Sequence, residues 1–86
     1  MPQLSSFYGI SISIYFADHN PPHFHATYGE FEALFDLRTI GILQGWLPPK
    51  AHTLVVEWAA LHQKELEENW QTIQKDGTYN KIQPLE

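Results

Sequence analysis

The feature that most limits the fold of this chain is the two-residue turn Gly29-Glu30, which lies inside the alternating run from His23 to Arg38. Glycine adopts the positive φ angle that the first position of a type II′ turn requires, and such turns join the strands of a hairpin. Counting outward from the turn gives one apolar face, made of the pairs Tyr28–Phe31, Ala26–Ala33 and Phe24–Phe35. A slip of one residue would invert every side chain, so this register is a sharp prediction.

The opposite face of the same hairpin collects its polar side chains. In the predicted register this face carries Thr27 against Glu32, His25 against Leu34, and His23 against Asp36, with Arg38 next along the chain. We therefore expect imidazole, carboxylate and guanidinium groups to share one side of a small sheet.

A further strand is predicted before the hairpin, over residues 9–17. Its residues alternate strictly, with Ile10, Ile12, Ile14 and Phe16 on one face and Ser11, Ser13 and Tyr15 on the other. Pro21-Pro22 then ends the strand, because proline has no backbone donor. Residues 40–46 are compatible with a short additional strand or with a loop.

The C-terminal half predicts one long helix over residues 49–75. Pro48-Pro49 suits a helix start, and Gly77 suits the left-handed cap at its end. About 26 residues would span roughly 39 Å, which exceeds the width of a three-stranded sheet. The predicted fold is therefore α+β, in a single domain that covers residues 1–86. An antiparallel sheet of three to four strands is crossed on one face by this helix, and part of the helix overhangs the sheet. An extended tail follows over residues 78–86.

Two features of the predicted helix bear on function. Leu66 and Ile73 lie on its apolar side and Trp70 lies near the boundary of that side, all in the overhanging half, where they would supply homodimer or partner contacts. His62 lies in the same apolar stripe. It is either a core histidine with one satisfied hydrogen bond or a group that reaches a polar site between helix and sheet.

Composition excludes several classes of function. Ten acidic against five basic residues give a net charge of −5, so nonspecific nucleic-acid binding is disfavoured. The absence of cysteine excludes disulfides, thiolate metal sites and cysteine nucleophiles. No signal peptide and no apolar run of membrane-spanning length is recognisable. We therefore expect a cytoplasmic protein that does not associate with a membrane.

Three of the five histidines fall within seven residues, at His19, His23 and His25. A His-x-His pair on a strand projects both imidazoles to one face, about 6–7 Å apart, which is close enough to share a metal ion. His19 would be the third ligand, and Asp36 would be a ligand or would orient an imidazole. Three imidazoles with an open fourth position resemble a catalytic zinc site.

Two other interpretations of the same residues stay open. Without a metal, His23 and His25 suit general acid–base chemistry, with Asp36 as the orienting group and Arg38 neutralising a phosphate, as in a ribonuclease. Alternatively, these groups form a hydrogen-bonded polar face that a partner covers.

The run DHNPPHFHATYG, from Asp18 to Gly29, resembles the hallmark of a bacterial domain-of-unknown-function family, number 4160. Leu47-Pro48, residues 56–59, His62 and residues 68–70 also resemble that family. The likeness covers about residues 7–85.

The resemblance implies that His19, His23, His25 and His62 belong to one site. It also implies a toxin–antitoxin-like arrangement with a small adjacent gene of family 2442. Our leading hypothesis is therefore a component of a two-gene module that acts through its His-rich face and protein contacts. The alternative is a hydrolase or ribonuclease that uses the histidine cluster, with or without a divalent metal such as zinc.

Overall fold

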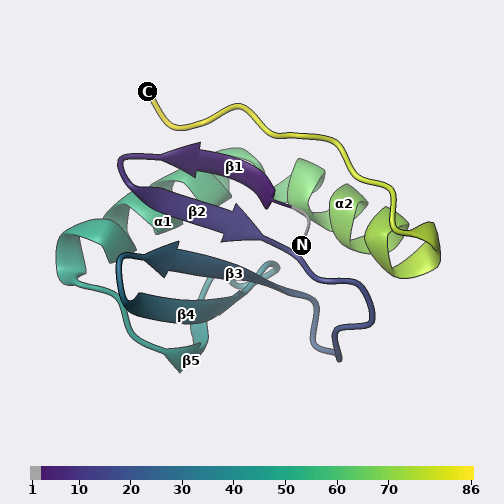
Figure 1. The fold of residues 1–86 in the computed structure, drawn as a ribbon, viewed down its shortest axis with the longest axis horizontal. Helices are drawn as coiled ribbons and strands as arrows, with labels where there is room; N and C mark the ends of the chain where they lie inside the picture. The colour runs from purple at the N-terminus through teal and green to yellow at the C-terminus, as the bar shows by residue number, and fades with distance from the viewer. Residues whose placement is uncertain (1–2) are drawn as a thin grey trace.

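Five strands form one antiparallel sheet whose spatial order is the order of the sequence (Figure 1). The computed structural model describes residues 3–86. The strands are β1 (Gln3–Phe7), β2 (Ile10–Ser13), β3 (His23–Tyr28), β4 (Phe31–Asp36) and β5 (Ile42–Gly45), and two helices follow, α1 (Pro49–Leu61) and α2 (Gln63–Asp76). The α+β class is confirmed, whereas the sheet has five strands instead of three to four and the helical half has two helices instead of one.

The register of the β3–β4 hairpin is confirmed in full. His23 pairs with Asp36, Phe24 with Phe35, and the pairing continues to Tyr28 and Phe31. Gly29 has a φ of 59°, as the first position of a type II′ turn requires. The apolar side chains Phe24, Ala26, Ala33 and Phe35 of the hairpin pack into the core. Their burial holds the register, because a slip of one residue would turn them to the solvent.

The strand predicted over residues 9–17 is shorter than expected. β2 ends at Ser13, and Phe16, predicted on the buried face, is 61% exposed. The register of β2 against β3 would set Phe16 opposite Pro22, which has no N–H to donate. The chain therefore leaves the sheet after Ser13 and forms a loop.

Strand β1 was not predicted. It pairs with β2 through a tight turn in which Tyr8 and Gly9 both have positive φ, at 51° and 79°. A tyrosine in the left-handed region is uncommon, so Gly9 is the one turn signal that the sequence of this turn carries. The C-terminal tail runs past β1 (Figure 1), and the Ile82 N–H donates to the Leu4 carbonyl at 2.8 Å.

The predicted single helix is divided at His62, whose φ of −122° and ψ of 26° are not helical. Beyond His62, α2 extends past the end of the sheet (Figure 1), yet Leu66, Trp70 and Ile73 are buried within the chain, with Trp70 only 5% exposed. Contrary to the prediction, these three side chains therefore offer a partner no surface. Burying a large apolar side chain contributes about 1.5–3 kcal/mol, which favours the bend over a straight helix.

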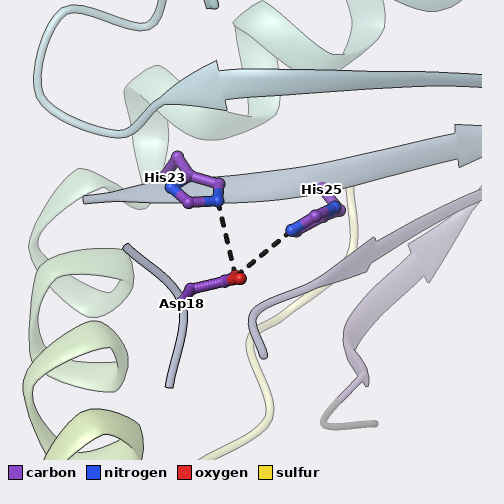
Figure 2. A group of neighbouring side chains, drawn as sticks. All are labelled: Asp18, His23 and His25. Carbon is purple, nitrogen blue, oxygen red and sulfur yellow. Dashed lines mark hydrogen bonds and ion pairs between the residues drawn. The ribbon is translucent and has the colours of Figure 1, made fainter. Parts of the chain in front are cut away.

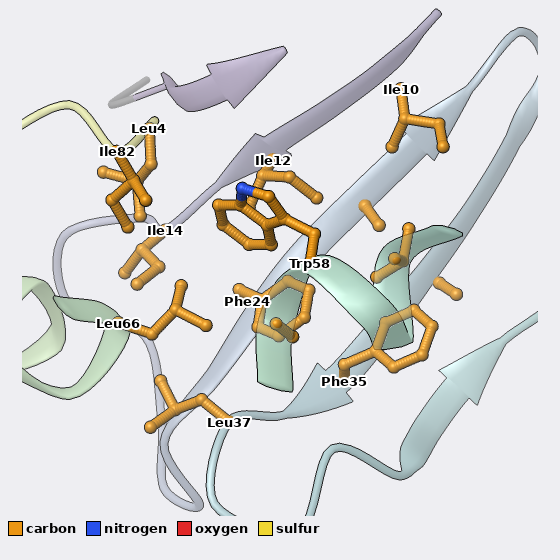
Figure 3. Packing of buried hydrophobic residues seen from close by; sticks show 14 of the residues in the cluster. Leu4, Ile10, Ile12, Ile14, Phe24, Phe35, Leu37, Trp58, Leu66 and Ile82 are labelled. Carbon is orange, nitrogen blue, oxygen red and sulfur yellow. The ribbon is translucent and has the colours of Figure 1, made fainter. Parts of the chain in front are cut away.

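The core lies between one face of the sheet and the two helices (Figure 3). Trp58 of α1 is fully buried among the apolar side chains of β2 and β3, and its ring lies 6.2 Å from that of Phe24. Its indole N–H donates to the Gln83 carbonyl at 2.9 Å, which ties the tail to the core. Within residues 3–86, neither helix has the length and apolarity that a bilayer span requires.

Candidate metal centre

The candidate site lies at the start of β3, on the polar face of the hairpin. His23 and His25 project to the same side because they are two residues apart on a strand. Their imidazole centroids are 5.2 Å apart. His23 is 7% exposed and His25 is half-buried, so both rings are fixed by their surroundings.

Asp18 completes a group of three converging side chains (Figure 2). Its Oδ2 atom lies 3.4 Å from Nε2 of His23 and 3.2 Å from Nε2 of His25. The three atoms all lie within 4.8 Å of one another. Two imidazole nitrogens and one carboxylate oxygen are a ligand set that zinc and non-haem iron both accept.

The second nitrogen of each ring faces an oxygen acceptor. Nδ1 of His23 lies 2.8 Å from the Pro21 carbonyl oxygen, and Nδ1 of His25 lies 3.2 Å from Oε2 of Glu32. A carbonyl only accepts, so Nδ1 of His23 carries the proton and the lone pair of the neutral ring is on Nε2. Histidines that bind metals are oriented in this way, by a carbonyl or carboxylate on the other nitrogen.

The hydrogen-bonding groups of His23, His25 and Asp18 favour a positive charge at the centre of the three side chains. If both rings donate from Nδ1 in their neutral forms, two Nε2 lone pairs and one carboxylate oxygen point at the same space. Lone pairs that face each other repel, unless a proton or a metal ion lies between them. A divalent ion would satisfy all three atoms at once, and so would a proton on Nε2 of each ring, through hydrogen bonds to Asp18.

Asp18 is positioned by α2, although 56 positions separate it from the residue that holds its loop. Gln74 accepts a hydrogen bond from the Ala17 N–H at 2.9 Å and donates one to the Tyr15 carbonyl at 2.9 Å. Ala17 has a φ of 66°, in the left-handed region that L-residues rarely adopt. The α2 helix therefore matters to the site, because its Gln74 side chain holds this loop.

Aromatic side chains border the two imidazoles. The Tyr15 ring meets His25 edge-on at 4.3 Å, and the Trp70 ring lies 5.5 Å from that of His23. Burial raises the pKa of the Tyr15 hydroxyl, and the nearby Glu32 and Asp18 carboxylates raise this pKa further. Tyr15 is therefore a neutral hydroxyl at physiological pH and adds no charge to the site.

A pocket of about 360 Å³ opens beside the group. Asp18, His23 and His25 form part of its wall, and the rest comes from His19, Asn20, Pro21, Leu34, Leu43 and Gln44. Leu34 faces His25 across β3 and β4, and Gln44 faces Leu34 across β4 and β5. One side of the candidate site is thus open to a small ligand.

Sequence reasoning brought together His23 and His25 but missed Asp18. His19, expected as the third ligand, is exposed at the pocket wall, and the group of possible ligands among the described residues holds Asp18 in its place. Asp36 is turned away from its expected role, because its Oδ1 atom accepts the Arg38 N–H at 2.7 Å and the Thr39 N–H at 3.1 Å. It stabilises the turn after β4. The proximity of Asp18 to the His-x-His pair in the sequence was the signal that could have indicated it.

The two remaining predicted site residues have other partners. Arg38 forms a two-pronged ion pair with Glu67, with N–O distances of 3.0 and 3.1 Å. The hydrogen bond to Glu67 raises the pKa of Arg38, and the same contact lowers the pKa of Glu67. Nδ1 of His62 lies 2.7 Å from the Glu65 carboxylate, and its ring packs 5.4 Å from that of Trp58.

A family model described as a domain of unknown function (DUF4160) matches residues 9–71, which include the loop, both histidines and most of α2. Searches of the curated proteins and of the solved structures found no match.

Proposed function

This chain belongs to the DUF4160 family, and we propose that it binds one divalent transition-metal ion through Asp18, His23 and His25. Zinc is our first choice, since catalytic zinc sites combine three protein ligands of this kind with an open position for water. A metal-bound water is a nucleophile at neutral pH, so the proposed activity is hydrolysis.

The observation that carries this proposal is the orientation of the two imidazoles. Each ring directs Nε2 at Asp18 and Nδ1 at an oxygen from a different part of the chain, the Pro21 carbonyl in one case and the Glu32 carboxylate in the other. Two rings that are each held through Nδ1 and that share one carboxylate oxygen through Nε2 match the arrangement that a common metal ion would need.

Metal analysis of untagged protein tests the proposal, because a histidine tag would bind metal itself. We expect one zinc or iron per chain after purification or titration, loss of binding in Asp18→Asn and His25→Ala, and unchanged binding in His19→Ala. His19→Ala is the matched control, since it removes an exposed imidazole from the same pocket. Circular dichroism checks that each variant is folded. A chain that binds no metal, or equal loss in His19→Ala, would overturn the proposal.

We further propose that this cytoplasmic chain acts with a small protein from a neighbouring gene, in the toxin–antitoxin-like arrangement that the family resemblance implies. The exposed edge strand supports a partner contact. All four residues of β5 are exposed, and Ile42, Leu43 and Trp46 leave large apolar side chains in water, with Trp46 55% exposed. Leu43 also lines the pocket, so a partner on β5 would cover the site.

Co-purification and a growth assay test this second proposal. We expect the neighbouring gene product to be retained by the wild-type chain and lost from Leu43→Glu, while Leu61→Glu, an exposed leucine on α1, serves as the control. We also expect overexpression to arrest growth and Asp18→Asn to relieve the arrest. Retention by both leucine variants, or an arrest that persists without Asp18, His23 and His25, would contradict it.

A further inference from the structure

We infer that the pocket beside Asp18, His23 and His25 takes a neutral ligand that carries an amide group, and not a phosphate-bearing one. This inference rests on the proposed metal site. It names the class of substrate from the charges and polar groups that line the pocket.

The charge of the loaded site gives the first argument. Asp18 and Glu32 each contribute −1 beside the two histidines, and a divalent ion contributes +2, so the sum is zero. A bound phosphate would bring further negative charge, and no lysine or arginine of the pocket would offset it. A neutral carbonyl group needs no compensating charge, because a metal ion polarises its oxygen directly.

The positions of the basic side chains give the second argument. Proteins that bind phosphate supply arginine, lysine or backbone donors around it. The chain has five basic residues, and none of them lines this pocket. Arg38 is paired with Glu67, Lys50 and Lys81 line two other hollows, and Lys64 and Lys75 belong to α2.

The polar groups of the pocket give the third argument. Asn20 and Gln44 are exposed at its wall, and neither side-chain amide has a hydrogen-bond partner among the described residues. A carboxamide offers one donor and one acceptor, as a peptide group does, so the two are complementary. Leu34, Leu43 and Pro21 add an apolar side for the neighbouring part of the ligand.

The size of the pocket agrees with a small ligand or one side chain of a peptide, since pockets for small molecules begin at about 300 Å³. Hydrolysis of an amide in this pocket would place the oxygen of one water on the carbonyl carbon. The C–N bond would break, and the proton would leave on the departing nitrogen. Water is the only co-reactant, so no oxidant or reductant is needed.

The test uses the full chain loaded with Co²⁺, whose visible absorption reports what reaches the metal. The probes are benzamide, a neutral amide with an apolar ring, and inorganic phosphate. We expect benzamide to change the spectrum with a Kd at least tenfold below that of phosphate. In Asn20→Ala/Gln44→Ala, we expect this Kd to rise about tenfold, which corresponds to two neutral hydrogen bonds, while Co²⁺ binding is unchanged.

The control variant is Gln71→Ala, which removes an exposed amide from α2 outside the pocket. Phosphate binding as tight as that of benzamide would overturn the inference and leave the metal site standing, and so would an unchanged Kd for benzamide in the double variant. A chain that does not bind Co²⁺ would overturn the metal site and this inference together.

Discussion

Gln74 gives the most direct test of how the fold builds the candidate site, because it holds the Asp18 loop without touching the proposed metal. Its side chain accepts from the Ala17 N–H and donates to the Tyr15 carbonyl, both at 2.9 Å. Gln74→Ala removes both hydrogen bonds and leaves Asp18, His23 and His25 in place. We therefore expect the loop to lose its fixed position while the sheet stays folded.

The size of the effect follows from these two contacts. Each hydrogen bond contributes about 0.5–1.5 kcal/mol, so the loop loses about 2 kcal/mol of the free energy that holds it over the site. Part of the free energy of zinc binding would then be used to return Asp18 to its position, so the affinity for zinc would fall. Since 1.4 kcal/mol corresponds to a tenfold change in Kd, we expect zinc affinity to fall about tenfold to thirtyfold.

Competition with a chromophoric chelator measures the Kd for zinc in wild type, Gln74→Ala and the control Gln71→Ala. Gln71 lies on the same helix but contacts Glu67 at 3.0 Å, so its loss should leave the Kd within about twofold of wild type. If Gln74→Ala binds zinc as tightly as wild type, then α2 does not position Asp18 and our account of the loop is refuted.

Three further predictions concern the stability of the fold, each measured by urea unfolding. Trp58→Phe should lower the free energy of unfolding by about 2–3 kcal/mol, because it leaves a cavity and an unpaired Gln83 carbonyl; a loss below about 1 kcal/mol would contradict this. Gly45→Ala should lower it by about 2 kcal/mol or more, since a Cβ would clash with the Glu32 carbonyl oxygen, and unchanged stability would refute the clash. Arg38 lowers the pKa of Glu67 below its usual 4.5, so the stability that this group contributes is present above that pH and is lost below it. In Glu67→Gln, we expect the free energy of unfolding to fall less steeply as the pH is lowered. An equally steep fall would argue against the ion pair.

The contrast between the hairpin and the helix shows where sequence reasoning succeeds. The register of β3 against β4 follows from Gly29 and the alternation beside it, because both act over a few residues. The division at His62 carries no proline or glycine signal. It depends on whether Leu66 and Ile73 find a surface to bury against, which is a property of the whole fold.

In the candidate site too, one part follows from the sequence and another part follows only from the tertiary structure. The sequence by itself determined that His23 and His25 share one face of a strand, since side chains alternate on any strand. Only the tertiary structure decided that Asp18, and not His19 or Asp36, meets them. That choice depends on contacts between Gln74 and a loop 57 and 59 positions earlier, and such long-range contacts have no local pattern in the sequence.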